Sequence, residues 1–354
     1  MRLSVVSVLL ASVVYAQTQT PATPTPDPNQ TIRVHVNEVV VPVTITDKDG
    51  RFVNDLDLKD FRIYDEGREQ KITFFTRERG QPVVTGFLID LSNANRLQWK
   101  TYQEAAQELV LTLMPGDSKK FQGYLISYAN EPELQMNTTN DPEKLIEKLR
   151  KMKPGGGAAL YDAIYMACTS RNLVKGEPIE PRRVIVVVGD GHDNASKHTL
   201  DQVIEIAQRN LVTVYGVSTV GFGFSSEGDA NLARLTQETG GRVEYPLQGT
   251  YKDVSGYLSV PSDEGNFAYK VGTGGYASAI AQGLFKAVAN VAGEVTTQYI
   301  LRYVPEVNDA KPKQFRNITV QVGLSNVKVR ARKGYYPEEP GTPTSAITSS
   351  SPSR

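Results

Sequence analysis

Two aspartates end the two most apolar stretches of the sequence, and both could bind a cation. Residues 83–90 read Val-Val-Thr-Gly-Phe-Leu-Ile-Asp, and residues 183–190 read Arg-Val-Ile-Val-Val-Val-Gly-Asp. Apolar runs without strict alternation are typical of strands that are buried on both faces of a parallel sheet. Asp90 and Asp190 are therefore expected at the carboxyl edge of the sheet, where open α/β sheets bind ligands.

Short side chains with oxygen atoms follow the first aspartate. Residues 90–95 read Asp-Leu-Ser-Asn-Ala-Asn, which places the hydroxyl of Ser92 two positions after the carboxylate of Asp90. Carboxylate and hydroxyl oxygens are ligands that Mg2+ and Ca2+ prefer. The side chains of Asn93 and Asn95 could add a carbonyl oxygen, but nothing in the sequence sets their direction.

A glycine loop between the two strands is expected to reach the same edge. Residues 154–162 read Pro-Gly-Gly-Gly-Ala-Ala-Leu-Tyr-Asp and lead into a predicted helix. The loop lacks the Gly-Lys-Ser/Thr of a phosphate-binding loop. We interpret it as a turn that brings the backbone at Gly157 close to the aspartates. His192 and Asp193 follow Asp190 after a single glycine and are candidates for contact with a partner.

Simpler interpretations remain open for these groups. Asp90 and Asp190 could accept hydrogen bonds from the turns that follow them and cap helices. His192 and His198 do not follow a standard metal spacing, and the sequence contains no Gly-x-Ser-x-Gly nucleophile turn. With three histidines in the chain, a metal-dependent hydrolase that uses Asp190 and His192 is the least favoured function.

The elements expected to position these residues alternate between strand and helix over residues 81–298. This alternation predicts an α/β domain with a mainly parallel sheet and helices on both faces. A stretch rich in Gly, Ser and Tyr at 246–276 predicts an insertion loop, and a helix is expected over 277–294. The other predicted strands cover residues 121–128, 212–217 and 242–245. The other predicted helices cover 97–113, 160–168, 199–210 and 230–239, and one more is expected to start at Pro142 with Asp141 as its cap.

The segments on either side of this domain have β character. Residues 31–80 contain alternating apolar runs and a hairpin turn at 47–50, and residues 299–336 contain three further predicted strands. A small sheet needs a partner that covers its apolar face. We therefore expect the two flanking segments to pair as one β-sandwich built from both ends of the chain.

The composition fits a globular chain and excludes some partners. The 354 residues are 40% hydrophobic and 22% charged, which is enough to bury a large core. Lys plus Arg and Asp plus Glu both number 39, so the zero net charge gives no reason to expect nucleic acid as a partner. The single cysteine, Cys168, cannot form an internal disulfide and is expected in the core.

The ends of the sequence indicate export. Residues 1–16 combine Arg2, an apolar stretch and a small-residue site, which predicts a signal peptide with cleavage after Ala16. Residues 17–30 are a Pro/Thr-rich linker, and residues 337–354 are a Pro/Ser/Thr tail that is expected to be disordered. No segment is expected to span a membrane, so we predict a secreted or periplasmic protein.

The aspartate motifs resemble those of von Willebrand factor A domains. In that family a metal-ion-dependent adhesion site begins Asp-x-Ser-x-Ser, and a Thr and a second Asp complete the set that holds one divalent cation. Asp90, Ser92 and Asp190 match this set. Ala94 and Ala158 replace the second Ser and the Thr. The resemblance implies a degenerate site in which water would complete the coordination of Mg2+, Mn2+ or Ca2+. No other cofactor is expected.

The flanking segments are similar to those of the secreted von Willebrand factor A-related proteins typical of Acidobacteria. The similar stretches cover residues 43–53, 58–67 and 315–336. The resemblance implies a Rossmann-like A domain framed by a β-sandwich, in a non-catalytic protein-binding module of the adhesion type. A structural or assembly component of the cell envelope is the alternative. The sequence does not identify the protein ligand.

Overall fold

The computed structural model describes most of the residues that follow the predicted leader and linker. The described residues are 38–77, 81–96, 99–116, 118–170, 173, 181–219, 227–246, 264–305 and 314–337. They lie within one compact unit, Asn37–Arg354. The predicted signal peptide (1–16), the linker (17–30) and the tail after Pro337 lie outside the described residues.

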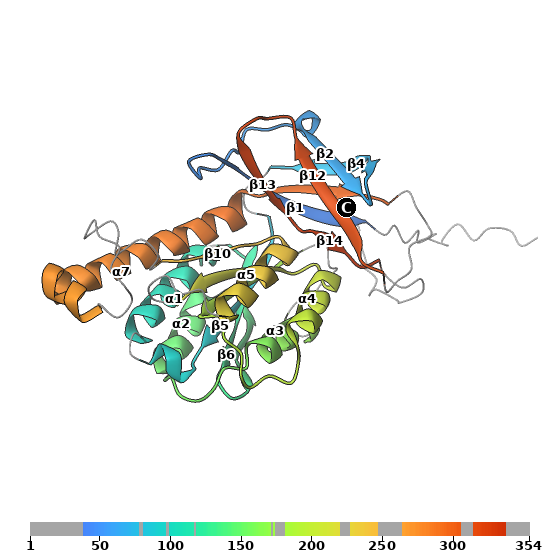
Figure 1. Cartoon of the computed structure of the whole chain (residues 1–354). Helices are drawn as coiled ribbons and strands as arrows, with labels where there is room; N and C mark the ends of the chain where they lie inside the picture. The colour runs from blue at the N-terminus through green and yellow to red at the C-terminus, as the bar shows by residue number, and fades with distance from the viewer. Residues whose placement is uncertain are drawn as a thin grey trace, which may run out of the picture. The chain divides into compact units, whose positions relative to one another are not determined.

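A six-stranded sheet occupies the middle of the chain, in the order β10-β9-β8-β5-β6-β7 (Figure 1). Neighbouring strands are parallel except for β7, which pairs antiparallel with β6. All eight residues of β5 are buried, as the continuous apolar run predicted. The strands are β5 (Val83–Asp90), β6 (Phe121–Tyr128), β7 (Pro132–Thr139), β8 (Arg182–Gly189), β9 (Thr213–Ser218) and β10 (Val243–Glu244).

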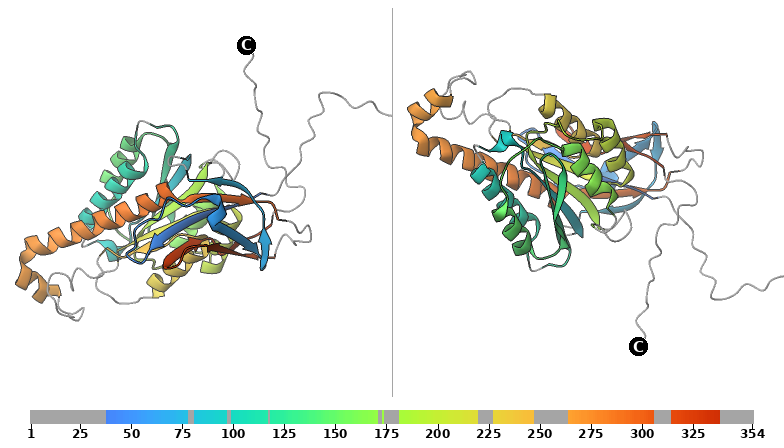
Figure 2. Two further views of the ribbon diagram at one scale, coloured as in Figure 1. Left: turned by 90° about the horizontal axis from the view of Figure 1, so that it is seen from above. Right: turned by 90° about the horizontal axis from the view of Figure 1, so that it is seen from below.

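Helices cover both faces of this sheet, which confirms the predicted Rossmann-like α/β fold (Figure 2). Alternate residues of the buried strands contact the two sets of helices, as the period of two in a strand requires. One face packs against α1 (Trp99–Leu113), α2 (Pro142–Lys151) and α7 (Glu264–Thr297). The other face packs against α3 (Leu160–Thr169), α4 (Leu200–Arg209) and α5 (Glu227–Thr239). Cys168 is buried in α3, as predicted.

The flanking segments form two antiparallel four-stranded sheets, in the orders β13-β1-β11-β4 and β14-β12-β2-β3. β1 pairs with both β11 and β13, so the first and last parts of the chain share one sheet. Side chains from both sheets form one apolar cluster, which confirms the predicted β-sandwich. The strands are β1 (Val39–Asp47), β2 (Phe61–Asp65), β3 (Arg68–Gln70), β4 (Ile72–Thr76), β11 (Tyr299–Tyr303), β12 (Arg316–Val322), β13 (Val327–Ala331) and β14 (Gly334–Tyr335).

One expectation about secondary structure was wrong, and one strand was not predicted. Residues 264–276, predicted as the last part of an insertion loop, belong to α7. Their glycines lower helix propensity, but once a helix has formed each further residue adds a hydrogen bond, and the packed part of α7 supplies that start. β7 was not predicted, because Pro-Glu-Leu-Gln-Met-Asn-Thr-Thr alternates only weakly and forms an edge strand. Within the described residues, no helix combines the length and the apolarity needed to cross a membrane.

A buried carboxylate joins α7 to the sandwich. Glu294 is inaccessible to solvent and accepts hydrogen bonds from Thr44 Oγ1 on β1 (3.0 Å) and from Arg330 Nη2 on β13 (2.7 Å). Arg242 Nε, next to β10, lies 2.9 Å from Glu294 Oε2. Two guanidinium groups thus offset a charge that would be very costly to bury alone.

A glutamine extends this junction. Gln298 Nε2 donates to Thr44 Oγ1 and to the Tyr215 hydroxyl on β9, both at 3.0 Å. Arg182, at the start of β8, donates to the carbonyl of Val295 (2.9 Å) and to Gln298 Oε1. The sandwich and the central sheet are therefore linked by one largely buried polar network.

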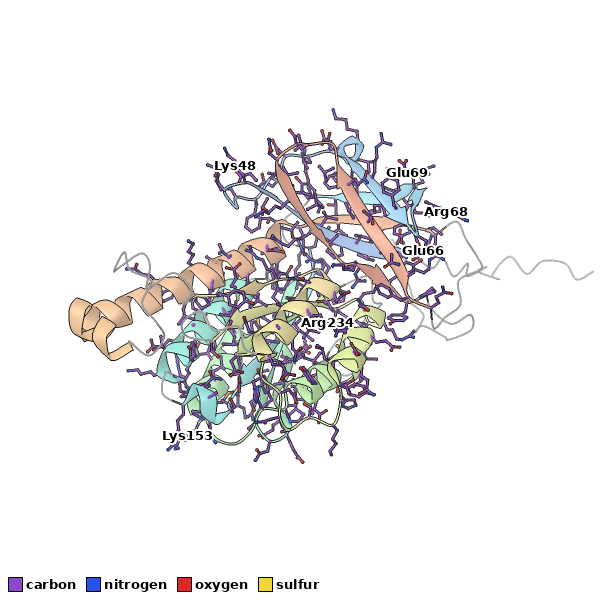
Figure 3. The ribbon with its side chains drawn as sticks, viewed as in Figure 1. Lys48, Glu66, Arg68, Glu69, Lys153 and Arg234 are labelled. Carbon is purple, nitrogen blue, oxygen red and sulfur yellow. The ribbon has the colours of Figure 1, made fainter. Side chains whose placement is uncertain are left out.

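We expect Glu294→Gln to lower the free energy of unfolding by about 1–3 kcal/mol, because Arg330 loses its carboxylate partner while Arg242 keeps its ion pair with Glu244 (2.7 Å). Urea unfolding would measure the change. Glu69→Gln is the control: Glu69 projects from the sandwich into solvent (Figure 3) and pairs with Arg62 at 3.2 Å. Exposed pairs contribute only about 0–1 kcal/mol. Equal, small losses in both variants would contradict a stabilising role of the junction.

Candidate cation and partner-binding site

The parallel sheet brings the predicted aspartates to one edge. Ile89 of β5 pairs with Val188 of β8, so the two strands end side by side. Asp90 is the last residue of β5, and Asp190 directly follows β8. On the other side of β5, Asp90 pairs with Tyr128 at the end of β6. The sequence prediction of a shared carboxyl edge is therefore correct.

The turn after β5 is held by the first aspartate. The amide N–H of Ser92 donates to Asp90 Oδ1 (2.7 Å), and Asn95 Nδ2 donates to the Asp90 carbonyl oxygen (3.4 Å). Residues Asn93–Asn95 form a short 3-10 turn, η2. After β8, the amide N–H of His192 donates in the same way to Asp190 Oδ1 (2.8 Å). One oxygen of each aspartate thus stabilises a local turn, as the simpler interpretation proposed.

The remaining oxygens of the first turn have no partner within the described part of the chain. Asp90 and Ser92 are 1% and 5% exposed. Asp90 Oδ2, Ser92 Oγ and the hydroxyl of Tyr128 are buried, and none of them forms a hydrogen bond with any described residue. Buried polar atoms in proteins are almost always hydrogen-bonded, so a group of exceptions at a strand edge points to a missing ligand.

Gly189, the last residue of β8, allows these oxygens to approach one another. A Cβ atom at Gly189 would lie 2.4 Å from the Tyr128 hydroxyl oxygen and 3.0 Å from Asp90 Oδ2. Both distances are shorter than a carbon–oxygen contact allows, so a side chain here would displace Tyr128 or Asp90. Tyr128 was missed by the sequence prediction, because its strand gave no sign that the hydroxyl would face Asp90.

The unpartnered oxygens fit a cation only in part. Asp90 Oδ2 and Ser92 Oγ are hard ligands for Mg2+, Mn2+ or Ca2+, and Asp190 lies at the same edge. Ala94 is exposed and Ala158 is buried, and neither supplies an oxygen from its side chain. Within the described residues, no three His, Cys, Asp or Glu side chains gather closely enough to hold a metal ion. A cation here would keep several water ligands.

Burial and charge both act on Asp90. Its removal from water raises the pKa of the carboxyl group to about 6, from an ordinary value of 3.8, and repulsion by Asp190 adds to the increase. The hydrogen bond from the amide of Ser92 opposes this effect but does not cancel it. Ionisation of Asp90 is therefore less favourable in the folded protein than in the unfolded chain. A bound cation would offset this free-energy cost.

The glycine loop lies against the turn after β5, as predicted. The amide N–H of Gly155 donates to the carbonyl oxygen of Leu91 (2.6 Å), and that of Asn93 donates to the carbonyl oxygen of Gly156 (3.1 Å). These two hydrogen bonds fix the loop beside the Asp90 turn. Gly157, the predicted contact residue, is half-buried.

Two of the predicted partner-binding residues have structural roles instead. Asn95 is 3% exposed and holds the Asp90 turn, so its side chain is not available to a partner. Asp193 Oδ2 accepts hydrogen bonds from the amide of Tyr161 (2.9 Å) and the hydroxyl of Ser196 (2.6 Å), and so caps the start of α3. The side chains of Asn93 and His192 are exposed, as a partner-binding role requires.

His198 belongs to a separate cluster. Its Nδ1 lies 2.6 Å from Asp162 Oδ1, and its ring stacks on Tyr165 with the centroids 3.7 Å apart. The amide of His198 also donates to Asp162 (3.0 Å). The pair joins the start of α4 to α3.

Comparison with known families identifies the central part of the chain. Residues 86–248 match the model of the von Willebrand factor type A domain. This range begins within β5, extends past β10 and includes all the residues of the candidate site. No curated protein matches the chain.

Solved structures with a similar fold come from several sources. An aerotolerance-related membrane protein from Bacteroides fragilis is 19% identical, with 58% of this chain and 99% of that chain covered and a TM-score of 0.37. The von Willebrand factor domain of a type V pili tip protein from Porphyromonas gingivalis is 18% identical, with 50% and 51% covered and a TM-score of 0.28. Proximal thread matrix protein 1 from the mussel byssus is 14% identical, with 64% and 49% covered and a TM-score of 0.41.

The pKa of Asp90 predicts how stability depends on pH when no cation is present. Below pH 3.8 the carboxyl group is protonated in both states, and its contribution is constant. As the pH rises through 6, the folded state loses about 3 kcal/mol relative to the unfolded state. Asp90→Asn keeps an oxygen for the amide of Ser92 and removes the charge. We expect this variant to be more stable than the wild type at pH 8 and not at pH 4.

Urea midpoints of metal-stripped protein between pH 4 and pH 8 would check this. The difference between Asp90→Asn and wild type should grow as the pH rises. Parallel curves would contradict a raised pKa of Asp90.

Proposed function

Since residues 86–248 are a von Willebrand factor type A domain, we propose that this chain binds another protein through the loops at the carboxyl edge of its central sheet. The observation that supports this site is the group of buried oxygens without hydrogen-bond partners, Asp90 Oδ2 and Ser92 Oγ, beside Asp190. A protein keeps such costly groups where a ligand will satisfy them. The exposed side chains of Asn93 and His192 lie on the same loops.

We propose that Asp90, Ser92 and Asp190 hold one divalent cation, Mg2+, Mn2+ or Ca2+. A bound cation would neutralise the two aspartates and offer a coordination position to an oxygen atom of the partner. Because Ala94 and Ala158 supply no side-chain oxygen, water would fill the other positions. The site is in this sense a degenerate form of the family's adhesion site.

The role we propose is binding without catalysis. His192, the histidine closest in sequence to Asp190, is exposed, and its amide rather than its ring contacts that aspartate. A general base must be within hydrogen-bond reach of a substrate proton and of the groups that orient it. The alternative of an envelope assembly component differs in one respect: partner binding would then depend on the sandwich and survive changes in the loops.

The cation site can be tested by thermal unfolding of the metal-stripped protein with Mg2+, Mn2+ or Ca2+ added. A cation that binds only the folded state stabilises it by about 2.7 kcal/mol at a hundredfold excess over its dissociation constant. We expect the midpoint to rise in wild type and in Asp201→Ala, where the exposed acid pairs with Arg234 away from the site. In Asp90→Ala we expect no rise. No rise in wild type at millimolar cation would overturn the cation site.

We also propose that the protein is exported and that its leader is cleaved after Ala16. Support comes from the charged start, the apolar stretch and the small residue at Ala16. Expressed in a bacterial host with its full sequence, the protein should be recovered outside the cytoplasm with Gln17 as its first residue. N-terminal sequencing would check this, and a product that keeps Met1 or stays in the cytoplasm would refute it.

A further inference from the structure

Two asparagines outside the predicted site hold the glycine loop. Asn130 Oδ1, in the turn between β6 and β7, accepts a hydrogen bond from the amide of Gly157 (2.7 Å). Asn194 Oδ1, in the segment between β8 and α4, accepts one from the amide of Ala158 (2.8 Å). In return, the amide of Asn194 donates to the carbonyl oxygen of Ala158 (2.9 Å).

Gly155 and Gly156 form hydrogen bonds with the turn after β5. Four consecutive loop residues, 155–158, are thus each hydrogen-bonded to a neighbouring segment. Three separate segments provide the ties: the turn after β5, the turn after β6 and the segment after β8. Every one of these hydrogen bonds is made by the protein itself. The loop is therefore held at each of these four residues by groups of the protein.

The glycines make room for the two carboxamides. A Cβ atom at Gly157 would lie 2.8 Å from Asn194 Oδ1 and 3.2 Å from Asn130 Oδ1. Gly156 has a positive φ of 103°, and a Cβ atom there would lie 3.0 Å from Asn130 Oδ1. Both amide oxygens thus pack directly on the loop, and a side chain at Gly157 would push them away.

The orientation of the two carboxamides follows from these bonds. A backbone N–H can donate only to the oxygen of a carboxamide, so the oxygen of each asparagine must face the loop. The NH2 groups remain as donors. Asn130 and Asn194 are both exposed, and neither NH2 group donates a hydrogen bond within the described part of the chain. The exposed Lys153 lies close in sequence to the loop and also carries donors (Figure 3).

We propose that Asn130 and Asn194 position the 155–158 loop without a cation and that their NH2 groups bind carboxylate or carbonyl oxygens of the protein partner. This inference rests on the proposed function, since it adds to the same loop edge. It assigns recognition to two residues that are not cation ligands. A partner would therefore retain part of its affinity in the presence of a chelator.

Two kinds of variant separate positioning from recognition. Asn130→Asp and Asn194→Asp keep an oxygen for the loop amides but lose the NH2 donors, whereas Asn130→Ala and Asn194→Ala lose both. Hydrogen exchange at the amides of Gly157 and Ala158 in metal-stripped protein reports on positioning. We expect each alanine variant to speed exchange at its own partner amide about tenfold, and each aspartate variant to leave it unchanged. Thermal midpoints would confirm that all four variants fold.

Acetate serves as the probe for recognition, with chloride at equal ionic strength as the control. In metal-stripped wild type, acetate should shift the side-chain NH2 resonances of Asn130 and Asn194. In each aspartate variant the remaining asparagine should respond less, because the donor pair is broken and a negative charge is added. Equal shifts with chloride, or an undiminished response in the aspartate variants, would overturn the recognition role.

A different result would overturn the positioning role. The amides of Gly157 and Ala158 would then exchange without protection in metal-stripped wild type and become protected from hydrogen exchange only when Mg2+ is added. In that case the cation organises the loop. These outcomes are independent of the thermal test of the cation site. A cation can bind or fail to bind whether or not the loop is ordered in its absence. Failure of this inference is thus distinguishable from failure of the proposed function.

Discussion

The parallel pairing of β5 with β8 is the constraint on which the loop edge depends. Because the two strands run in register to their ends, two carboxylates arrive at one place, and one of them, Asp90, is buried. Asp90 is repelled by Asp190 and has lost its hydration. The turn after β5 donates a hydrogen bond to only one of its two carboxylate oxygens, Oδ1. A strand buried along its whole length supplies the rigidity that keeps Asp90 in this position. The site therefore places a carboxyl group with a raised pKa on a stable scaffold, and such groups are common at functional sites.

The glycine loop shows a second way of organising the same edge. Where Ala94 and Ala158 lack hydroxyl groups, carboxamides from two other segments contact the loop backbone. Buried oxygens without partners and a loop that is fully tied by hydrogen bonds lie side by side. Within the described residues, the oxygens of the first part form no hydrogen bonds, whereas the loop forms several. A cation and the asparagines would thus act on neighbouring halves of one surface.

Much of this arrangement follows from the sequence. The apolar runs at 83–90 and 183–190 predicted two central strands, and their final aspartates predicted where the site lies. Those signals are local, since hydrophobic period and strand ends are read within a few residues. Asn130 and Asn194 could not be predicted in this way, because their roles depend on which turns meet in space. The same limit applies to Tyr128, whose hydroxyl faces Asp90 only because β8 ends in Gly189. The extension of α7 through a glycine-rich segment depends on packing elsewhere in the helix.

Both ends of the described chain lie in the sandwich: β1, the first strand, is hydrogen-bonded to β13, and β14, the last strand, pairs with β12. The A domain is inserted between these strands in sequence. Tension applied to the two ends of the chain would therefore act first on the strand pairs of the sandwich, without crossing the central sheet. The loops at the carboxyl edge of that sheet would keep their geometry under load for as long as the sandwich holds. A protein attached at both ends could in this way remain competent to bind while it is being stretched.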